Sequence, residues 1–287
     1  MKKHFDLFNS LNVIFLSIVS MITLLPFLLV LGSSFSDENT IAKYGFSIIP
    51  RKFSLAAYKS IFSNVSTVIN AYKVTLTVTI VGTVLAIAIT SMVAYALSRK
   101  QLRYRNVLNL FIYIPMVFSG GIVPFYIVIH KLGFVDNIWG LIIPMVFNPF
   151  NFFLLLNFFR GLPDEIVESA KIDGAGEFRI LLSIVMKIAL PGIATISLFY
   201  SLAFWNEWTL ALYLINKTEL YPLQFLLRAI MQRATIIAGS NAHFTGVIPA
   251  ESVKMATVIV TIGPILLVYP FIQRYFIKGL TIGSVKG

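Results

Sequence analysis

Six long apolar segments, none of which contains a charged residue, constrain this chain more than any other feature. About 20 apolar residues in a helix cross a ~30 Å hydrocarbon layer. None of the six contains Asp, Glu, Lys, Arg or His, and hydrophobic residues make up 57% of the 287 residues. They are Leu11–Leu31, Val74–Leu97, Val107–Ile129, Ile138–Phe159, Ile188–Phe204 and Met255–Ile272. The sequence therefore predicts an all-α integral membrane protein with six transmembrane helices, in one domain over residues 1–287.

The basic residues between these segments predict an orientation. Thirteen of the 23 Lys and Arg residues lie in the short segments on the side of the N-terminus, and ten lie in the longer loops on the other side. The densest cluster is Arg99, Lys100, Arg103 and Arg105. Because basic residues favour the cytoplasmic side, we expect both termini to be cytoplasmic. The same bias, with attraction to anionic lipid, accounts for the net charge of +11, so we expect no nucleic acid partner.

The first apolar segment resembles a signal peptide, because Lys2-Lys3 precede it and Gly32-Ser33-Ser34 follow it. Its apolar region is longer than the usual 7–15 residues, roughly, and lacks a clean small-x-small cleavage site. We therefore expect an uncleaved transmembrane helix.

Several kinds of chemistry lack their sequence signals. The chain has no G-x-x-x-x-G-K-[ST] phosphate loop and no cysteine, and His4, His130 and His243 stand at no metal-ligand spacing. The sequence thus predicts a non-catalytic protein without cofactor or metal. Proton-coupled carriers commonly need carboxylates or histidines within the membrane, and the six segments have none. A passive channel and an externally powered transporter remain.

The third and fourth segments are interrupted by helix-breaking residues. The interruptions are Pro115, Ser119-Gly120-Gly121 and Pro124 in the third, and Pro144 and Asn148-Pro149-Phe150-Asn151 in the fourth. Backbone freed at membrane depth must be buried in protein or line a wet cavity. One interpretation is that both helices line a polar path, with Asn148 and Asn151 facing it. The other is that the kinks and glycines serve helix packing.

A charged loop at about 160–187 separates the fourth and fifth segments. Leu162-Pro163-Asp164-Glu165 favours a helix start, and Gly174 favours a turn because glycine takes positive φ without steric cost. The helical pattern resumes at Glu177–Leu182. This predicts a helix-turn-helix whose small Ala170 and Ala175 permit close approach of a partner. Its carboxylates would be available to basic groups of that partner, namely Glu168, Asp173 and Glu177. A solvated amphipathic loop is the alternative.

Four stretches of the chain resemble a known family. Glu168-x-Ala170-x-x-Asp173-Gly174-Ala175, with Leu190-Pro191 later, resembles the "EAA" loop of permease subunits in binding-protein-dependent ABC importers. Trp205-Asn206-Glu207-Trp208 with Ala211-Leu212, and the ending Gly279-Leu280-Thr281-Ile282-Gly283-Ser284-Val285-Lys286-Gly287, are similar to MalG-like carbohydrate permeases. Ser119-Gly120-Gly121-x-x-Pro124 is similar to the LplC-like subgroup for complex oligosaccharides. The chain departs from the pattern at Ser169 and at Met186-Lys187, where Leu-Pro is expected.

The resemblance implies the type I ABC importer permease architecture in the membrane of a bacterial cell. It implies a second homologous permease, a cytoplasmic ATPase dimer and an extracytoplasmic solute-binding protein as partners, and a carbohydrate as substrate. The 160–187 loop would couple the ATPase to the spans, and we name it the coupling loop. Its implied coupling residues are Glu168, Ala170, Asp173, Gly174 and Ala175. A tail at about 274–287 would reach towards the ATPase through Gly279, Gly283, Lys286 and Gly287.

Aromatic and amide side chains suit a carbohydrate, because rings stack on sugar C–H faces and amides bond to hydroxyls. The candidates for the substrate path are Tyr113, Tyr126, Asn148, Asn151, Trp205, Asn206 and Glu207. For Trp205 and Trp208 we favour a belt at the membrane interface. An ABC permease for an amino acid or phosphate is the alternative to a sugar permease, and an independent channel or secondary carrier is a further one.

Overall fold

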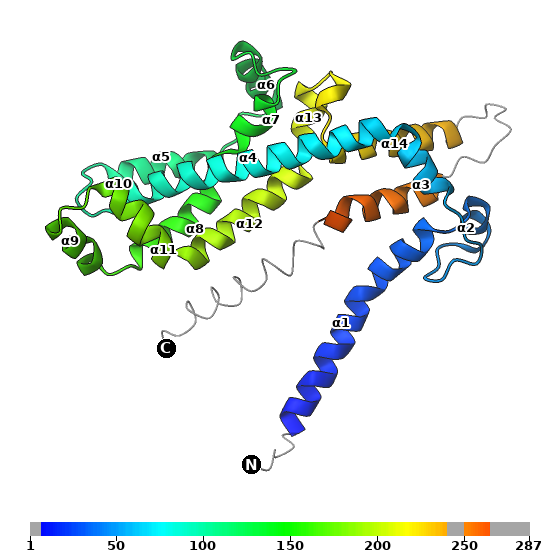
Figure 1. The fold of residues 1–287 in the computed structure, drawn as a ribbon, viewed down its shortest axis with the longest axis horizontal. Coiled ribbons are helices and arrows are strands. Elements are labelled where there is room, and N and C mark those ends of the chain that lie inside the picture. The colour runs from blue at the N-terminus through cyan, green and yellow to red at the C-terminus, as the bar shows by residue number, and fades with distance from the viewer. Residues whose placement is uncertain (1–6, 240–249, 265–287) are drawn as a thin grey trace. The chain divides into compact units, whose positions relative to one another are not determined.

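The computed structural model describes residues 7–239 and 250–264, and helices dominate these ranges (Figure 1). They contain no strand, only one isolated antiparallel bridge between Ser36 and Phe53. This confirms the predicted all-α class. The α-helices are α1 (Leu7–Ser34), α2 (Glu38–Tyr44), α3 (Ala56–Ile61), α4 (Val65–Ser98), α5 (Arg105–Val117), α6 (Ile122–Lys131), α7 (Trp139–Ile142), α8 (Pro149–Arg160), α9 (Asp164–Ile172), α10 (Glu177–Ile180), α11 (Met186–Ile188), α12 (Leu190–Asn206), α13 (Thr209–Leu214) and α14 (Leu223–Gly239). Residues 250–264 are also helical.

Shorter helical turns connect some of these helices. Three are 3₁₀ turns, η1 (Phe62–Asn64), η2 (Ile143–Met145) and η4 (Thr218–Leu220), and one is a π-helical segment, η3 (Leu181–Val185). The chain divides into two compact units. Unit 1 comprises Met1–Val68 and Leu227–Ile265, and unit 2 comprises Ile69–Leu226 and Leu266–Gly287. The single permease domain expected from the sequence stays a prediction.

Within the described ranges, two helical stretches are long and apolar enough to cross a membrane, and three bent pairs raise that number to five if each pair is one span. The straight stretches, Ser10–Ser34 and Ala56–Ser98, contain the first two predicted spans. The bent pairs correspond to the third, fourth and fifth, with bends of 116°, 48° and 87°. The sixth predicted span is described only to residue 264, where it is helical. Six crossings and cytoplasmic termini therefore remain predictions.

The breaks predicted in the third and fourth segments are confirmed. In the third, α5 ends before Ser119-Gly120-Gly121, and α6 begins after Gly121, whose φ is +80°. With 13 and 10 residues, α5 and α6 are roughly 20 and 15 Å long, so neither crosses a ~30 Å layer alone. The fifth segment also bends, at Ala189 between α11 and α12, which the sequence analysis did not predict.

Unit 1 contains α1, whose apolar side chains are exposed along most of its length, as a helix surrounded by lipid requires. Its C-terminal end is different, because Ser33 and Ser34 are buried. There, the Phe35 ring stacks on Phe53 and Tyr58 at 5.6 and 5.0 Å between centroids. These contacts join the end of α1 to the segment that leads into α3.

Unit 1 also contains a carboxylate cap between distant parts of the sequence. Glu38, at the start of α2, accepts hydrogen bonds from the backbone N–H groups of Glu251 and Ser252 at 2.8 and 3.0 Å. It also accepts one from the Ser252 hydroxyl at 2.9 Å. These amides belong to the first turn of the helix over residues 250–264, where a negative charge is favourable.

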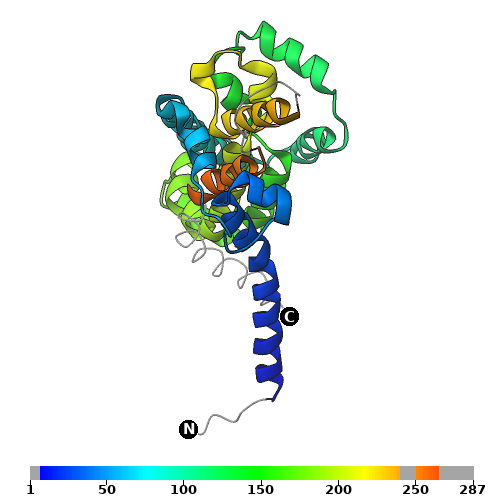
Figure 2. The same cartoon turned by 90° about the vertical axis from the view of Figure 1, so that its right-hand side faces the viewer.

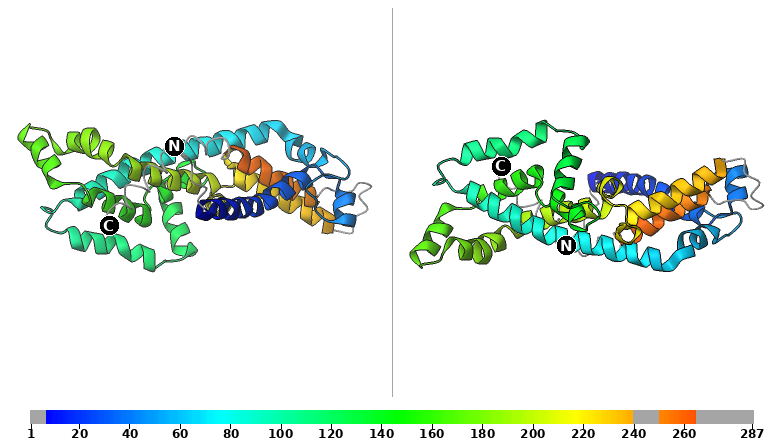
Figure 3. Two further views of the ribbon diagram at one scale, coloured as in Figure 1. Left: turned by 90° about the horizontal axis from the view of Figure 1, so that it is seen from below. Right: turned by 90° about the horizontal axis from the view of Figure 1, so that it is seen from above.

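In unit 2, α12 packs against α8, and both lie along α4 (Figures 1 and 3). The largest buried side chains at this contact include Phe152, Leu156, Ile196 and Phe204. Gly82 of α4 allows the close approach, since a Cβ there would lie 2.5 Å from Cζ of Phe204. The core therefore combines large apolar side chains with a small residue, as is common between membrane helices.

Tyr200 is a polar group within this core and is only 1% exposed. Its hydroxyl lies 2.8 Å from the Thr90 hydroxyl of α4. It also accepts a hydrogen bond of 2.9 Å from the backbone N–H of Asn148, at the break before α8. Tyr200 thus connects α4, α8 and α12 and satisfies the backbone that the fourth-segment break leaves open.

Candidate coupling site

The coupling loop folds as the predicted helix-turn-helix. α9 begins at Asp164 directly after Pro163, with Asp164 and Glu165 in its first turn. It ends in a pair of hydrogen bonds: the Ala175 N–H donates to the Ala170 carbonyl at 3.0 Å, and the Gly174 N–H to the Lys171 carbonyl at 3.0 Å. This pattern is the Schellman motif, which satisfies the last carbonyls of a helix.

Gly174 occupies the left-handed position of this motif, with φ of +76°. A side chain on an L-residue there costs about 1–2 kcal/mol, so glycine suits the turn. The turn predicted at Gly174 is confirmed. A Cβ at Gly174 would meet no atom of this chain within 4 Å, so the space next to it is open.

Polar contacts stabilise the coupling loop internally and join it to the C-terminal end of α4. Lys100 Nζ lies 2.7 Å from Asp164 Oδ2, and Lys171 Nζ lies 2.6 Å from Glu177 Oε1. The Tyr95 hydroxyl donates a hydrogen bond to Glu177 Oε2. The hydrogen bond from Lys100 holds the pKa of Asp164 below its usual value, and Asp164 in turn raises the pKa of Lys100.

Two expectations for the coupling loop need correction. Glu177 is not a free carboxylate, because Lys171 and Tyr95 bind it within the chain, although its side chain is 55% exposed. Ala170 is 7% exposed and packs in the core of unit 2 with Val167, so it does not form an open contact surface. A small residue suits this position, because Ala170 lies on the face of α9 that packs against the rest of unit 2.

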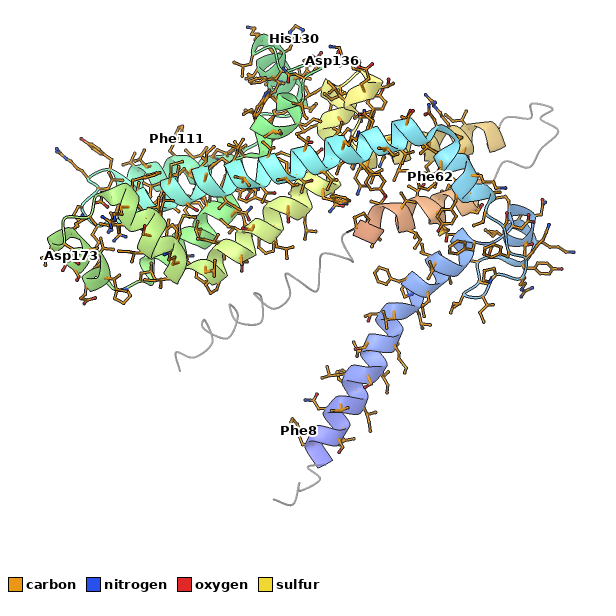
Figure 4. The ribbon with its side chains drawn as sticks, in the orientation of Figure 1. Phe8, Phe62, Phe111, His130, Asp136 and Asp173 are labelled. Atoms are coloured by element: carbon orange, nitrogen blue, oxygen red, sulfur yellow. The ribbon has the colours of Figure 1, made fainter. Side chains whose placement is uncertain are left out.

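Glu168 and Asp173 are exposed, as predicted, and Asp173 lies at the end of unit 2 that α9 forms (Figure 4). Two apolar neighbours are also exposed: Ile172 to 87% and Phe178 to 64%. Helical periodicity could have identified Ile172, because it falls on the face of α9 opposite Val167 and Ala170. The exposed surface of the coupling loop is therefore both acidic and apolar.

From the turn, the chain returns to the core through α10, η3 and α11. Ile180, Leu181 and Val185 of this stretch are buried. A π-helical turn at a functional site often repositions side chains, and η3 places one between the loop and α12. Met186-Lys187, the departure from the family pattern, directly follow this turn, with Met186 packed on the core and Lys187 exposed. A movement of α9 would reach α12 through this short path.

The structure brings three of the seven candidate path residues to one region. Asn148 caps α8, since its Oδ1 accepts a hydrogen bond of 3.2 Å from the Asn151 N–H, and Asn151 is buried. Tyr113 of α5 lies edge-on to Phe153 of α8, with ring centroids 6.3 Å apart. The ring centroid of Tyr126, in α6, lies 5.9 Å from that of His130, and no contact between Tyr126 and these three residues is seen.

The remaining three candidates form the junction of α12 and α13, which we name the 205–208 corner. Trp205 is buried, and Glu207 Oε1 accepts a 2.7 Å hydrogen bond from the Leu210 N–H at the start of α13. The Asn206 amide donates to the Leu202 carbonyl at 2.9 Å and accepts from Gln224 at 3.1 Å. The polar groups of Asn206 and Glu207 are thus engaged within the chain. The four tail residues Gly279, Gly283, Lys286 and Gly287 lie outside the described residues.

Two neighbouring cavities lie beside the coupling loop. One, of about 290 Å³, is lined by Ser98, Arg99, Lys100, Arg105, Asn106, Phe159, Arg160, Leu162 and Asp164. The other, of about 110 Å³, is lined by Arg99, Lys100, Gln101, Asp164, Val167, Glu168 and Lys171. None of the seven candidate path residues lines either cavity. Over residues 7–239 and 250–264, no three His, Asp or Glu side chains come together as a metal site would need.

The comparison with protein families decides the class of this chain. The model of the family "Binding-protein-dependent transport system inner membrane component" matches residues 80–282, which is well over half of the sequence. The chain belongs to this family. It is therefore a permease, the membrane subunit of such a transport system, and this class of subunit is not catalytic.

Several relatives of this permease are named as carbohydrate transport proteins. It is 40% identical to Protein LplC of Bacillus subtilis over 281 residues, covering 98% of this chain and 95% of the relative. It is also 40% identical to the polygalacturonan/rhamnogalacturonan transport system permease protein YtcP of the same species, covering 98% and 99%. The resemblance to MalG-like and LplC-like permeases is confirmed.

A solved structure has the same fold. A chain of a bacterial ABC transporter involved in the import of the acidic polysaccharide alginate matches this permease with a TM-score of 0.80 at 28% identity. The match covers 96% of this chain and 99% of that chain. The architecture of an ABC importer permease is thereby confirmed at the level of the fold.

Proposed function

We propose that this permease forms, with a second permease, the path by which an ATP-driven importer moves an oligosaccharide across the bacterial cytoplasmic membrane. An extracytoplasmic binding protein delivers the sugar, and an ATPase dimer on a separate chain supplies the energy. The coupling loop docks on the ATPase through Glu168, Asp173 and the turn at Gly174, while Ala170 and Ala175 hold α9 in position. The tail residues Gly279, Gly283, Lys286 and Gly287 approach the same ATPase.

One observation carries this proposal: the base of the coupling loop is held by the chain, and its tip is open. At the base, Val167, Ala170 and Ile180 are buried, and Tyr95 of α4 bonds to Glu177. At the tip, Glu168, Ile172 and Asp173 are exposed, and nothing in the chain fills the space beside Gly174. A loop built only for solvation would not need this rigid base or an isoleucine exposed to 87%.

The relatives support an oligosaccharide as the substrate. YtcP is described as a polygalacturonan/rhamnogalacturonan permease, and the solved transporter as one for alginate. For the sugar path, the region of Tyr113, Asn148 and Asn151 has more support than the 205–208 corner. In the corner, Trp205 is buried and both polar side chains bond within the chain. By comparison, Tyr113 is half-exposed, and Asn148 is exposed although its Oδ1 caps α8.

The proposal is tested by reversing single charges on the coupling loop. The permease is co-expressed with its partner subunits, and the ATPase that co-purifies with it is quantified. We expect Glu168→Lys and Asp173→Lys each to lower this yield about tenfold, because each replaces a favourable contact with a repulsive one. Glu219→Lys is the matched control, because Glu219 is exposed on η4, away from the coupling loop.

Uptake distinguishes an importer from an independent channel. Sealed vesicles with the assembled transporter and its binding protein should take up oligosaccharide only with ATP on the cytoplasmic side. Equal uptake without ATP, or equal ATPase yield in the three charge variants and the wild type, would contradict the proposal.

A further inference from the structure

The larger cavity beside the coupling loop has a strongly basic lining. Four of its lining residues are cations, Arg99, Lys100, Arg105 and Arg160, and Asp164 is its one acidic lining residue. Lys100 pairs with Asp164 at 2.7 Å, so the charges of these two residues largely balance. Three guanidinium groups from three different segments remain to set the charge of the cavity.

In the described part of the chain, these three arginines form no ion pair within 4 Å, and only Arg99 is attracted to carboxylates at longer range, those of Glu177 and Asp164. No carboxylate there forms an ion pair with Arg99, Arg105 or Arg160. Arg99 lies over the Tyr95 ring at 4.3 Å, and its Nε and Nη2 atoms are buried without a hydrogen-bond partner. Buried guanidinium donors without acceptors are unfavourable. The arrangement is stabilised if a ligand brings acceptor oxygens and negative charge.

The position of the cavity along the sequence narrows the choice of ligand. Arg99 follows the predicted span Val74–Leu97, Arg160 follows Ile138–Phe159, and Arg105 precedes Val107–Ile129. All three side chains therefore lie where predicted spans end, which is the depth of lipid phosphates in a membrane. A phospholipid headgroup is always present at this depth, whereas a soluble anion has to reach it from the aqueous phase.

An apolar surface begins at the cavity rim. α5, the teal helix of Figure 2, starts at Arg105 and has no buried residue. It exposes Val107, Leu110 and Phe111, of which Phe111 is labelled in Figure 4. A lipid whose phosphate sits among the arginines can place its acyl chains along these side chains. The volume of about 290 Å³ is roughly ten times that of one water in the liquid, which suits a phosphodiester with part of its headgroup.

We propose that this cavity binds the phosphate of an anionic phospholipid, such as phosphatidylglycerol, through the guanidinium groups of Arg99, Arg105 and Arg160. Guanidinium matches phosphate oxygens with paired hydrogen bonds, and basic pockets between membrane helices on the cytoplasmic side are suited to anionic headgroups. The smaller cavity shares Arg99, Lys100 and Asp164 with the larger one and reaches Glu168 and Lys171 of α9. The bound lipid thereby supports the base of the coupling loop.

The test measures lipid retention and not transport, so its outcome is independent of the proposed function. The assembled transporter is purified into nanodiscs that contain equal amounts of phosphatidylglycerol and phosphatidylcholine. It is then released and examined by native mass spectrometry for bound lipid. The wild type should retain phosphatidylglycerol in preference to phosphatidylcholine. Retention in Arg105→Gln and Arg160→Gln should fall about tenfold, because each variant loses one paired guanidinium–phosphate contact.

Arg103→Gln is the matched control, because Arg103 lies in the same loop as Arg105 but lines neither cavity. Its retention should equal that of the wild type, and equal loss in Arg103→Gln and Arg105→Gln would overturn the proposal. Equal retention of phosphatidylglycerol and phosphatidylcholine by the wild type would also overturn the proposal. This result would be found if a partner subunit filled the cavity. Millimolar inorganic phosphate should leave the bound lipid in place. Its full displacement would show that the site takes a soluble anion.

Discussion

The coupling loop and the 205–208 corner lie near opposite ends of α4 and use polar residues in opposite ways. The coupling loop contacts α4 at Tyr95 and just beyond it at Lys100. Towards the other end of α4, Asn206 of the corner accepts a hydrogen bond from Gln224, and the neighbouring Leu223 N–H donates to Thr75 of α4. Thr75 and Ser98 are roughly 35 Å apart along the helix. In the coupling loop Glu168 and Asp173 face outwards, whereas in the corner Asn206 and Glu207 bond within the chain.

The comparison shows that a polar motif in a membrane protein can have either of two roles. Exposed carboxylates at a rigid turn are free to bind a partner. Carboxylates and amides that cap or join helices satisfy backbone groups that lipid cannot. The sequence made both motifs candidates for function, with a belt at the membrane interface favoured for Trp205 and Trp208, and the hydrogen bonds now separate the two motifs. Substitutions at both ends of α4 test whether this separation holds.

The largest effect is expected at the turn of the coupling loop. Gly174→Leu forces an L-residue into φ of +76°, at a cost of about 1–2 kcal/mol, and fills the space where the ATPase would dock. A cost of about 1–2 kcal/mol lowers the fraction of molecules with the native turn by roughly 5- to 30-fold. Because the leucine side chain also occupies the docking space, we expect ATP-driven uptake by the assembled transporter to fall at least about tenfold. Uptake and ATP hydrolysis are measured on the same vesicles, and hydrolysis should fall less than uptake.

Gly133→Leu is the control for backbone strain. Gly133 has φ of +74° and, like Gly174, would meet no atom within 4 Å of its Cβ. The two variants thus introduce the same strain, and only Gly174 lies in the coupling loop. Equal losses of uptake would mean that strain alone causes the defect, and the distinction between the two ends of α4 would fail.

A smaller effect is expected in the core between the two ends. Tyr200→Phe removes the hydroxyl that lies next to Thr90 and accepts from the Asn148 N–H. Hydrogen bonds between membrane helices contribute on average about 0.6 and up to about 1.7 kcal/mol to stability. We expect the loss of stability in Tyr200→Phe to lie in the upper part of this range, because the Asn148 N–H is left without a partner. The thermal stability of the assembled transporter measures this loss. Tyr213→Phe is the control, since Tyr213 is 44% exposed on α13. An equal effect of both would contradict the role of Tyr200.

Local signals predicted much of this fold. Helix-breaking residues located the breaks in the third and fourth segments, and Pro163 and Gly174 located the start and the turn of the coupling loop. Each of these features depends on the conformational preference of one or two residues.

Features that depend on distant contacts were not predictable in this way. The bend at Ala189 did have a local signal, Pro191 in the first turn of α12, which the sequence analysis did not use. By contrast, the engagement of Glu177 depends on Tyr95, 82 residues away. Tyr200 resembled any aromatic residue of a span until its contacts with α4 and α8 were known. The basic cavity likewise requires the C-terminal ends of α4 and α8 and the N-terminal end of α5 to lie close together.

A modest effect is expected in the 205–208 corner if it is structural. Glu207→Ala removes the acceptor for the Leu210 N–H and should destabilise the start of α13 by about 1 kcal/mol. Glu207→Gln keeps an acceptor oxygen and should restore most of this stability. The apparent KM for oligosaccharide should stay within twofold, roughly, in both variants, because a cap contributes to folding and not to substrate binding. A large increase in KM with unchanged stability would instead place Glu207 in the substrate path.

The smallest effect is expected at Asp136, which joins the turn after α6 to the loop after α13 (Figure 4). Its carboxylate accepts hydrogen bonds from the N–H groups of Asn216 and Lys217, and these bonds hold its pKa below the ordinary value of 3.8. Since this pKa is lower in the folded state, the stabilisation is present above the unfolded pKa and is lost as the pH falls through the folded value. Asp136→Asn tolerates the φ of +54° and keeps one acceptor. Thermal stability should therefore fall slightly, by the same amount throughout pH 5–8, roughly, because Asp136 stays ionised there. A difference from the wild type that shrinks between pH 8 and 5 would mean that Asp136 titrates near neutrality, and that the outer loops are not joined as described.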